Sequence, residues 1–305
     1  MKYDVIAAGE LLIDMVSKEY VDHLGEAYSF EPHPGGSPAN FASNLHFLGK
    51  RVGLISNVGN DAFGNTLKAF VEDRGLTSDL LTHSEEPSTV IFVAKTTGSP
   101  DFQVYRAADK NLRWSPFAKA LAIGASVFHT TCFALSENPA RVHILRAASA
   151  FAKTGATVSI DANYAEKVWP DRERAQLVLL DYIRHGAIVK MSEVDWERLY
   201  QEPLTKDNAS ASAKTLLAAG AKAVCFTFGA DGAMAFDETT SVSITAKPIK
   251  IVDATGAGDS FWAGFVAAYL DRAELIDCLN AGANVAAKKL VQQGPLREMI
   301  DYRVG

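Results

Sequence analysis

Short apolar runs alternate along the chain with longer segments whose apolar residues recur at helical spacing. The short runs are rich in β-branched residues and cover residues 4–9, 52–56, 125–130, 157–161, 187–191 and 223–228. Their length and composition predict buried strands. The longer segments carry cap residues at the start or glycine at the end, which predicts helices over residues 60–75, 137–155, 195–200 and 211–220.

This alternation favours an α/β fold, a doubly wound and mostly parallel sheet with helices on both faces. Two regions break the pattern. Residues 10–20 and 27–36 predict a strand followed by a turn, and residues 88–106 predict two strands joined by the turn sequence TTGSPD. We expect these regions, about 10–35 and 88–106, to form a small β lid whose apolar face is covered by a cleft or by a second subunit.

Composition narrows the class of protein. The chain has 305 residues and is 48% hydrophobic, enough for one large domain spanning 1–305. A net charge of −6 without runs of Lys or Arg argues against nucleic-acid and membrane partners and favours a small-molecule ligand. Three scattered cysteines and the lack of a signal-peptide pattern or a spanning apolar run indicate a cytoplasmic protein.

The stretch IVDATGAGDSFWAGF, residues 251–265, places glycines and an acid where an apolar helix is expected to begin. A helix N-terminus offers unpaired amides and roughly half a positive charge, and glycine lets a ligand approach them closely. Such a site binds anions. With Asp259 beside it, the arrangement suits phosphoryl transfer, in which an acid accepts the proton of the attacking hydroxyl. The alternative is a tight turn with an Asp cap.

Two other glycine-containing stretches have similar alternatives. In residues 34–49, a diglycine and Asn40 precede an amphipathic helix, which suits either a polar ligand or simple packing and capping. Residues 226–234, FTFGADGAM, follow a strand at the edge where parallel sheets bind ligands, although a plain hairpin turn is an equal alternative. The chain contains no GxxxxGK[ST], no GxGxxG after the first strand and no HExxH, which argues against P-loop, dinucleotide-binding and zinc-protease classes.

In their order along the chain, GGSPAN (35–40), TFGADGA (227–233) and DATGAGDSFWAGF (253–265) resemble the signatures of the ribokinase-like (PfkB) sugar kinases. The resemblance covers nearly the full length, and the last of the three motifs is the most specific. It implies a ribokinase-like fold with a β lid, and ATP-dependent phosphorylation of a sugar hydroxyl.

The resemblance also implies roles for individual residues. Asp259 would be the catalytic base, and the amides of Gly256, Ala257 and Gly258 would form an anion hole. The implied sugar contacts are Asp14, Gly35, Gly36, Asn40, Arg106, Asp161 and Asn163. The implied nucleotide contacts are Ser192, Thr227, Gly229, Gly232 and Asn284.

Metal ions follow from the same resemblance. Family members often carry Asn-x-x-Glu after the fifth core strand, where this chain has Ser192 and Asp195. Asp195 would hold Mg²⁺ through water, on a shorter arm than Glu. Asp253 would belong to a loop that holds a monovalent cation, with K⁺ as the expected ion.

The substrate is suggested by residues 161–171, DANYAEKVWPD, which resemble the D-P-N-x-R stretch of fructokinases and ketodeoxygluconate kinases. The arginine position is Ala165, so the cation that helps pair an acid sugar is missing, and burying an unpaired carboxylate is costly. This favours fructose or a related ketohexose. Kinases of 2-keto-3-deoxygluconate, ribose or nucleosides remain alternatives of the same class. A catalytically silent sugar- or nucleotide-binding protein and a regulatory nucleotide-binding module are alternatives of other classes. A homodimer through the lid is expected.

Overall fold

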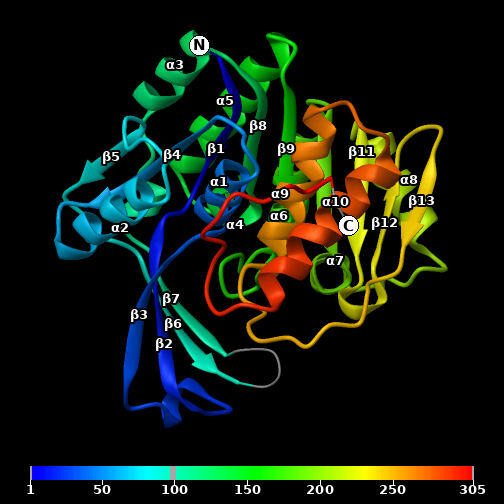
Figure 1. Ribbon diagram of the computed structural model, residues 1–305. Helices are drawn as coiled ribbons and strands as arrows, with labels where there is room; N and C mark the ends of the chain where they lie inside the picture. Colours follow the sequence, from blue (N-terminus) through cyan, green and yellow to red (C-terminus); the bar gives the residue numbers. More distant parts are fainter. Residues whose placement is uncertain (1, 97–100, 304–305) are drawn as a thin grey trace.

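The computed structural model describes residues 2–96 and 101–303 and contains two β-sheets covered by helices (Figure 1). The larger sheet has nine strands in the order β13-β12-β11-β10-β9-β8-β1-β4-β5. Its strands are β1 (Tyr3–Ala8), β4 (Val52–Gly59), β5 (Leu81–Ser84), β8 (Ala125–Thr131), β9 (Thr157–Asp161), β10 (Ala187–Ser192), β11 (Ala223–Thr227), β12 (Ala233–Phe236) and β13 (Ser241–Ile244). Neighbouring strands pair in parallel from β5 to β11, and β12 and β13 add an antiparallel edge.

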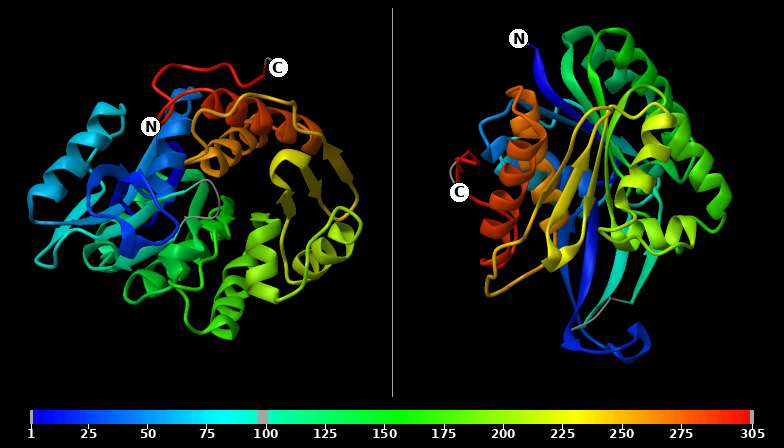
Figure 2. Two further views of the ribbon diagram at one scale, coloured as in Figure 1. Left: turned by 90° about the horizontal axis from the view of Figure 1, so that it is seen from below. Right: turned by 90° about the vertical axis from the view of Figure 1, so that its right-hand side faces the viewer.

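Helices cover both faces of this sheet. One layer contains α1 (Ser37–Phe47), α2 (Ala62–Asp73), α9 (Ala257–Leu270) and α10 (Leu275–Leu290). The other contains α3 (Trp114–Ile123), α4 (Cys132–Leu135), α5 (Ala140–Lys153), α6 (Arg172–Ile183), α7 (Glu193–Tyr200) and α8 (Ala209–Ala218). In the right-hand view of Figure 2, α9 and α10 lie on one side of the yellow strands and the green helices lie on the other.

The central strand β1 shows why the sequence folds in this way. Val5 and Ala7 pack into one hydrophobic cluster, while Ile6 and Ala8 pack into the other. Successive side chains of a strand point to opposite faces, so a strand that is covered on both sides must be apolar at every position. The doubly wound α/β fold predicted from the short apolar runs is therefore confirmed.

The small sheet is built from β2 (Leu12–Tyr20), β3 (Phe30–Gly35), β6 (Val90–Lys95) and β7 (Phe102–Tyr105), in the order β3-β2-β6-β7. It projects below the large sheet in Figure 1. The turn predicted within TTGSPD lies largely outside the described residues. Whether this sheet acts as a lid stays a prediction.

Part of the segment predicted as a turn, residues 27–36, is in fact the strand β3. Pro32 and Pro34 pair with Met15 and Ile13 of β2. Proline has no N–H and cannot donate to a ladder, and it is tolerated in β3 because β3 is an edge strand with only one neighbour. None of the helices in the described part of the chain combines the length and apolarity needed to cross a bilayer.

Candidate active site

The turn before α9 forms the N-terminus that the sequence predicted. Gly256 is the N-cap residue and has a left-handed conformation with φ of 73°. The amides of the first helical turn have no acceptor one turn earlier in the helix. The Ala257 amide donates to the carbonyl of Ala254 at 3.2 Å. One of the three amides predicted to form the anion hole is thus already engaged within the turn, and a bound phosphoryl group must compete for it.

The carboxylate of Asp259 joins this turn to the start of α1. Its Oδ1 accepts a hydrogen bond from Ser37 Oγ at 2.5 Å, and its Oδ2 accepts one from Asn40 Nδ2 at 3.0 Å. Burial raises the pKa of Asp259, and the bonds from Ser37 and Asn40 oppose the shift. The GGSPAN and GAGD motifs, more than 200 positions apart in sequence, therefore meet at one proton-accepting group. Ser37 was not among the predicted site residues, although it lies inside the first motif.

Gly35 and Gly36 allow the segment before α1 to pack closely against its neighbours. Gly36 has φ of 113°, and a Cβ at this position would lie 2.4 Å from the main-chain oxygen of Glu10. A Cβ at Gly35 would lie 2.1 Å from Oδ2 of Asp14 on β2. Only glycine allows such approaches. The segment before α1 thus lies directly against the Asp14 carboxylate.

Asp14 is a second carboxylate close to Asp259. Burial raises its pKa to about 7, and the negative charge of Asp259 adds to the shift. Two neighbouring carboxylates in a partly buried place suit a ligand with several hydroxyl groups, because each hydroxyl can donate to a carboxylate oxygen.

Asp14→Asn should stabilise the ligand-free protein most at alkaline pH. The pKa of Asp14 rises from an unfolded value of about 3.9 to about 7 in the folded chain. The contribution of Asp14 to the stability of the folded chain is thus most favourable below about pH 4, and it is lost as pH rises through 7. The melting temperature of Asp14→Asn should exceed that of wild type at pH 8, and the difference should shrink towards pH 4.

The same variant should weaken sugar binding, with KM rising by about 10- to 100-fold, the range expected for losing hydrogen bonds to a charged group. Melting curves at several pH values and sugar kinetics check both effects. Asp22→Asn, at an exposed acid of the same small sheet region, is the matched control and should change neither. Unchanged KM in Asp14→Asn would remove Asp14 from the sugar site.

A buried ion pair lies beneath the GAGD turn. Lys190 Nζ on β10 is 2.9 Å and 2.7 Å from the two carboxylate oxygens of Asp161, its register partner on β9. A Cβ at Gly258 would lie 3.3 Å from Nζ, so the ammonium group borders the first turn of α9. Burial lowers the pKa of Lys190, but the carboxylates of Asp161, Asp195 and Asp259 outweigh this and the net shift is upward.

Lys190 was missed by the sequence analysis, and Asp161 was predicted to bind sugar. The signal for Lys190 was a lysine inside the apolar run AIVKM, because a lysine is almost never buried unless it is paired. Asp161 uses both oxygens on Lys190, so any sugar contact must share them. Asn163 lies two residues further on, exposed, with a positive φ of 34° that is uncommon for a non-glycine residue.

Four of the five predicted nucleotide positions lie at or just after the carboxyl ends of β10 and β11. Ser192 and Thr227 are register partners there. Gly229 and Gly232 lie in the connection between β11 and the antiparallel β12, so the hairpin alternative correctly describes the local structure. Asn284 is half-buried on α10. Their contact with a nucleotide stays a prediction.

Asp195 makes structural hydrogen bonds at the start of α7. It forms a capping box with Ser192 at the start of α7, and its Oδ1 accepts the amide of Tyr164 at 2.9 Å. Both carboxylate oxygens are thus engaged, and the predicted contact with Mg²⁺-bound water must use their remaining lone pairs. Among residues 2–96 and 101–303, no group of three or more His, Cys, Asp or Glu side chains is arranged to hold a metal ion.

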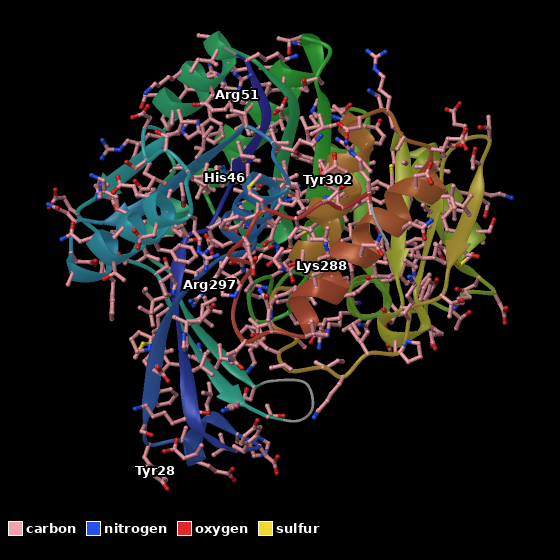
Figure 3. All side chains as sticks on the ribbon, in the orientation of Figure 1. Tyr28, His46, Arg51, Lys288, Arg297 and Tyr302 are labelled. Atoms are coloured by element: carbon pink, nitrogen blue, oxygen red, sulfur yellow. The ribbon has the colours of Figure 1, made fainter. Side chains whose placement is uncertain are left out.

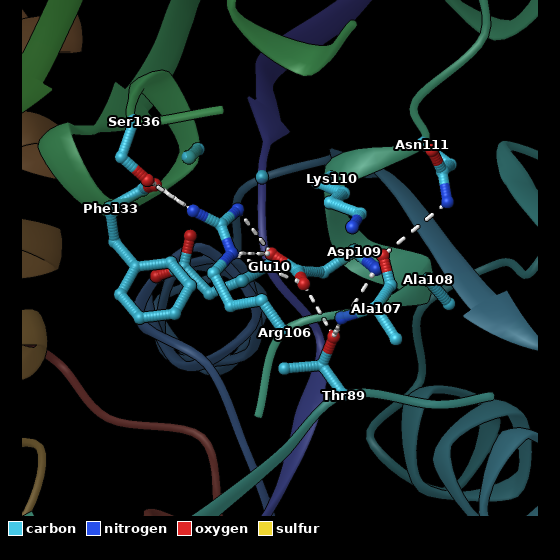
Figure 4. A network of polar contacts seen from close by, with 12 residues as sticks. Glu10, Thr89, Arg106, Ala107, Ala108, Asp109, Lys110, Asn111, Phe133 and Ser136 are labelled. Atoms are coloured by element: carbon cyan, nitrogen blue, oxygen red, sulfur yellow. Dashed lines mark hydrogen bonds and ion pairs between the residues drawn. The ribbon is translucent and has the colours of Figure 1, made fainter. Parts of the chain in front are cut away.

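Arg106 is held by a polar network at the base of the small sheet (Figure 4). Its guanidinium forms an ion pair with Asp109 at 2.5 Å and donates to the Phe133 carbonyl at 3.0 Å and to Ser136. The predicted sugar contact of Arg106 must therefore use a guanidinium group that already donates to Asp109, Phe133 and Ser136. Glu10 is buried beside it, accepts a bond from Thr131, and burial with the nearby Asp109 raises its pKa to about 8.

Asp253, predicted to border a monovalent cation, is contacted instead by an ammonium group of the chain. Lys289 Nζ lies 2.9 Å from the main-chain oxygen of Asp253 and 3.0 Å from Oδ2. Two oxygens of Asp253 that would face a free cation are therefore already bound.

Known proteins resemble this chain over most of its length. Residues 2–299 match the pfkB family of carbohydrate kinases. An ATP-dependent 6-phosphofructokinase of Thermoanaerobacterium thermosaccharolyticum is 31% identical over 98% of this chain and 92% of its own length. The solved fructokinase of Halothermothrix orenii is 33% identical, with a TM-score of 0.81 over 96% of this chain and 100% of that one. An uncharacterized sugar kinase of Pyrococcus horikoshii, solved in complex with ATP, is 26% identical, with a TM-score of 0.82 over 95% and 93% of the two chains.

Proposed function

The chain belongs to the pfkB family of carbohydrate kinases, and from this premise we propose that it transfers the γ-phosphoryl group of ATP to fructose, giving fructose 6-phosphate and ADP. The observation that carries the proposal is the Asp259 carboxylate, bonded to the first turn of α1 at the N-terminus of α9. A sugar hydroxyl that replaces Ser37 or Asn40 as donor to this carboxylate is placed next to an anion site.

In the proposed step, Asp259 accepts the proton of the sugar hydroxyl as its oxygen bonds to the γ-phosphorus. The bond from that phosphorus to the β–γ bridging oxygen breaks, and ADP leaves with the electron pair. Gly256, Ala257 and Gly258 would donate their amides to the oxygens of the moving group. ATP would arrive as its Mg²⁺ complex, which neutralises charge on the phosphates, and Asp195 would hold water bound to the metal.

A neutral sugar is supported by the pairing of three cations that belong to, or are bonded to, segments predicted to bind the sugar. Arg106 is paired with Asp109, Lys190 with Asp161, and Lys167 with Asp101. Asp14 and Asp259 add further negative charge at the predicted sugar site. A phosphorylated or carboxylated sugar would enter this field without a free cation from these three residues, which is costly for a buried anion.

A substrate panel tests the proposal. The protein is incubated with MgATP and fructose, fructose 6-phosphate, 2-keto-3-deoxygluconate or ribose, and ADP release is followed. We expect turnover with fructose and little with the anionic sugars. Preference for fructose 6-phosphate, the substrate named for one relative, would overturn the choice of a neutral sugar. A flat response to all four would favour a silent binding protein.

The small sheet supports a dimer as part of the proposal. Tyr20, Tyr28 and Tyr105 are 67%, 86% and 61% exposed on or beside its strands, and Figure 3 shows Tyr28 at its far end. Aromatic residues exposed on a sheet with open edges favour an interface. Light scattering of the intact protein gives its mass in solution, and a monomer at assay concentration would contradict the dimer.

A further inference from the structure

The loop that leads into α9 contains a buried cation supplied by α10. Lys289 is 2% exposed and lies in the last turn of the helix. Its ammonium group binds two oxygens of Asp253, the main-chain oxygen at 2.9 Å and Oδ2 at 3.0 Å. A lysine so deeply buried needs such a partner.

Asp253 and its neighbours make further hydrogen bonds. Asp253 Oδ1 accepts the amide of Thr255 at 2.9 Å, and Oδ2 accepts the amide of Gly294 at 3.0 Å. The amides of Val252 and Asp253 donate to the carbonyl of Leu290 at 2.8 Å and 3.3 Å. Val252 and Asp253 are therefore bonded to the end of α10, and Asp253 in turn holds Thr255, the residue before the turn at Gly256.

These residues do not fit the free monovalent cation expected at Asp253. A K⁺ ion needs several oxygens directed at one point, in place of its hydration shell. Here the two Asp253 oxygens are directed at Lys289 Nζ, and an added K⁺ ion would meet a like charge there. The ammonium group carries the same single charge as K⁺ and is similar in size.

We infer that Lys289 is a built-in replacement for the monovalent cation: it neutralises Asp253, binds its main-chain oxygen and thereby fixes the turn whose amides receive the phosphoryl group. Catalysis then requires no added K⁺. The inference rests on the proposed function for its kinetic consequence and on geometry alone for its effect on stability.

The first experiment compares wild-type turnover in buffers whose monovalent cation is choline, Na⁺, K⁺ or NH₄⁺. We expect equal rates in all four. A wild-type enzyme whose turnover needs K⁺ or NH₄⁺ would overturn the inference. This measurement does not depend on the folding of any variant.

The second experiment uses Lys289→Met. Its kcat should fall by up to about 100-fold, as for a small misplacement of catalytic groups, and K⁺ or NH₄⁺ should restore part of it whereas choline should not. Lys288→Met is the matched control, since Lys288 is the exposed neighbour on the same helix (Figure 3) and bonds only the Asp301 carbonyl among the contacts described. It should behave as wild type.

Melting temperature provides a readout that does not depend on activity. K⁺ and NH₄⁺ should raise that of Lys289→Met above its value in choline, and should leave wild type and Lys288→Met unchanged, because an ion that binds only the folded chain stabilises it. A folded Lys289→Met that responds to none of these ions would overturn the inference. If no sugar is phosphorylated, the proposed function fails. The melting temperatures in the different cations still decide the role of Lys289.

Discussion

Asp259→Asn is expected to lower kcat by about 10²- to 10⁴-fold, the contribution of a general base, while the protein stays folded. The amide cannot take up the proton of the sugar hydroxyl. It can still accept the Ser37 hydroxyl, and the Asn40 amide can rotate to present its oxygen to the new NH₂ group. Because burial raises the pKa of Asp259, removing its charge should leave the melting temperature equal or higher.

Steady-state kinetics with fructose and MgATP, together with melting curves, check this result. Asp277→Asn is a matched control, because Asp277 occupies the third position of α10 as Asp259 does in α9, but is exposed. Its activity should equal that of wild type. If Asp259→Asn keeps its kcat within tenfold, Asp259 is not the base and the proposed mechanism fails.

The core of the fold could be predicted from the sequence because its strands are covered on both faces. Such strands are short apolar runs, and β1, β8, β9 and β10 begin and end within one residue of the predicted ranges. The strands β5, β12 and β13 could not be found in this way. Each has four residues at or near an edge, too few for a periodic pattern, and their position depends on neighbours distant in sequence.

The candidate site was predictable where glycines and an acid form local motifs, and only through family resemblance were the motifs assigned to one site. The ion pairs between side chains of the site could not be predicted. Lys190 meets Asp161 only because β9 and β10 lie in a particular register, and Lys289 meets Asp253 across 36 positions of sequence. Such pairs depend on how whole helices and strands pack against one another. A local pattern in the sequence carries no information about that packing.

Lys190→Met is expected to lower the free energy of unfolding by about 3–5 kcal/mol, the usual cost of removing one partner of a buried ion pair. The variant leaves the Asp161 carboxylate 3% exposed and without its cation. Burial already raises the pKa of Asp161 to about 6 although Lys190 opposes the shift, and losing Lys190 raises it further. The loss of stability is thus complete above the raised pKa that Asp161 has in the folded variant, and it shrinks as pH falls towards about 6, below which Asp161 is protonated in the folded state of both proteins.

Urea unfolding at pH 8 and pH 5 measures the effect, which should be larger at pH 8. Lys190→Met/Asp161→Asn should regain most of the lost stability, because it leaves no unpaired charge. Lys68→Met, in the exposed pair with Glu72 at 3.9 Å, is the control and should cost less than about 0.5 kcal/mol. Since Lys190 borders Gly258, the double variant should remain impaired in kcat even where its stability returns. A double variant with wild-type kcat would mean that this ion pair stabilises the fold alone and plays no part in holding the anion site.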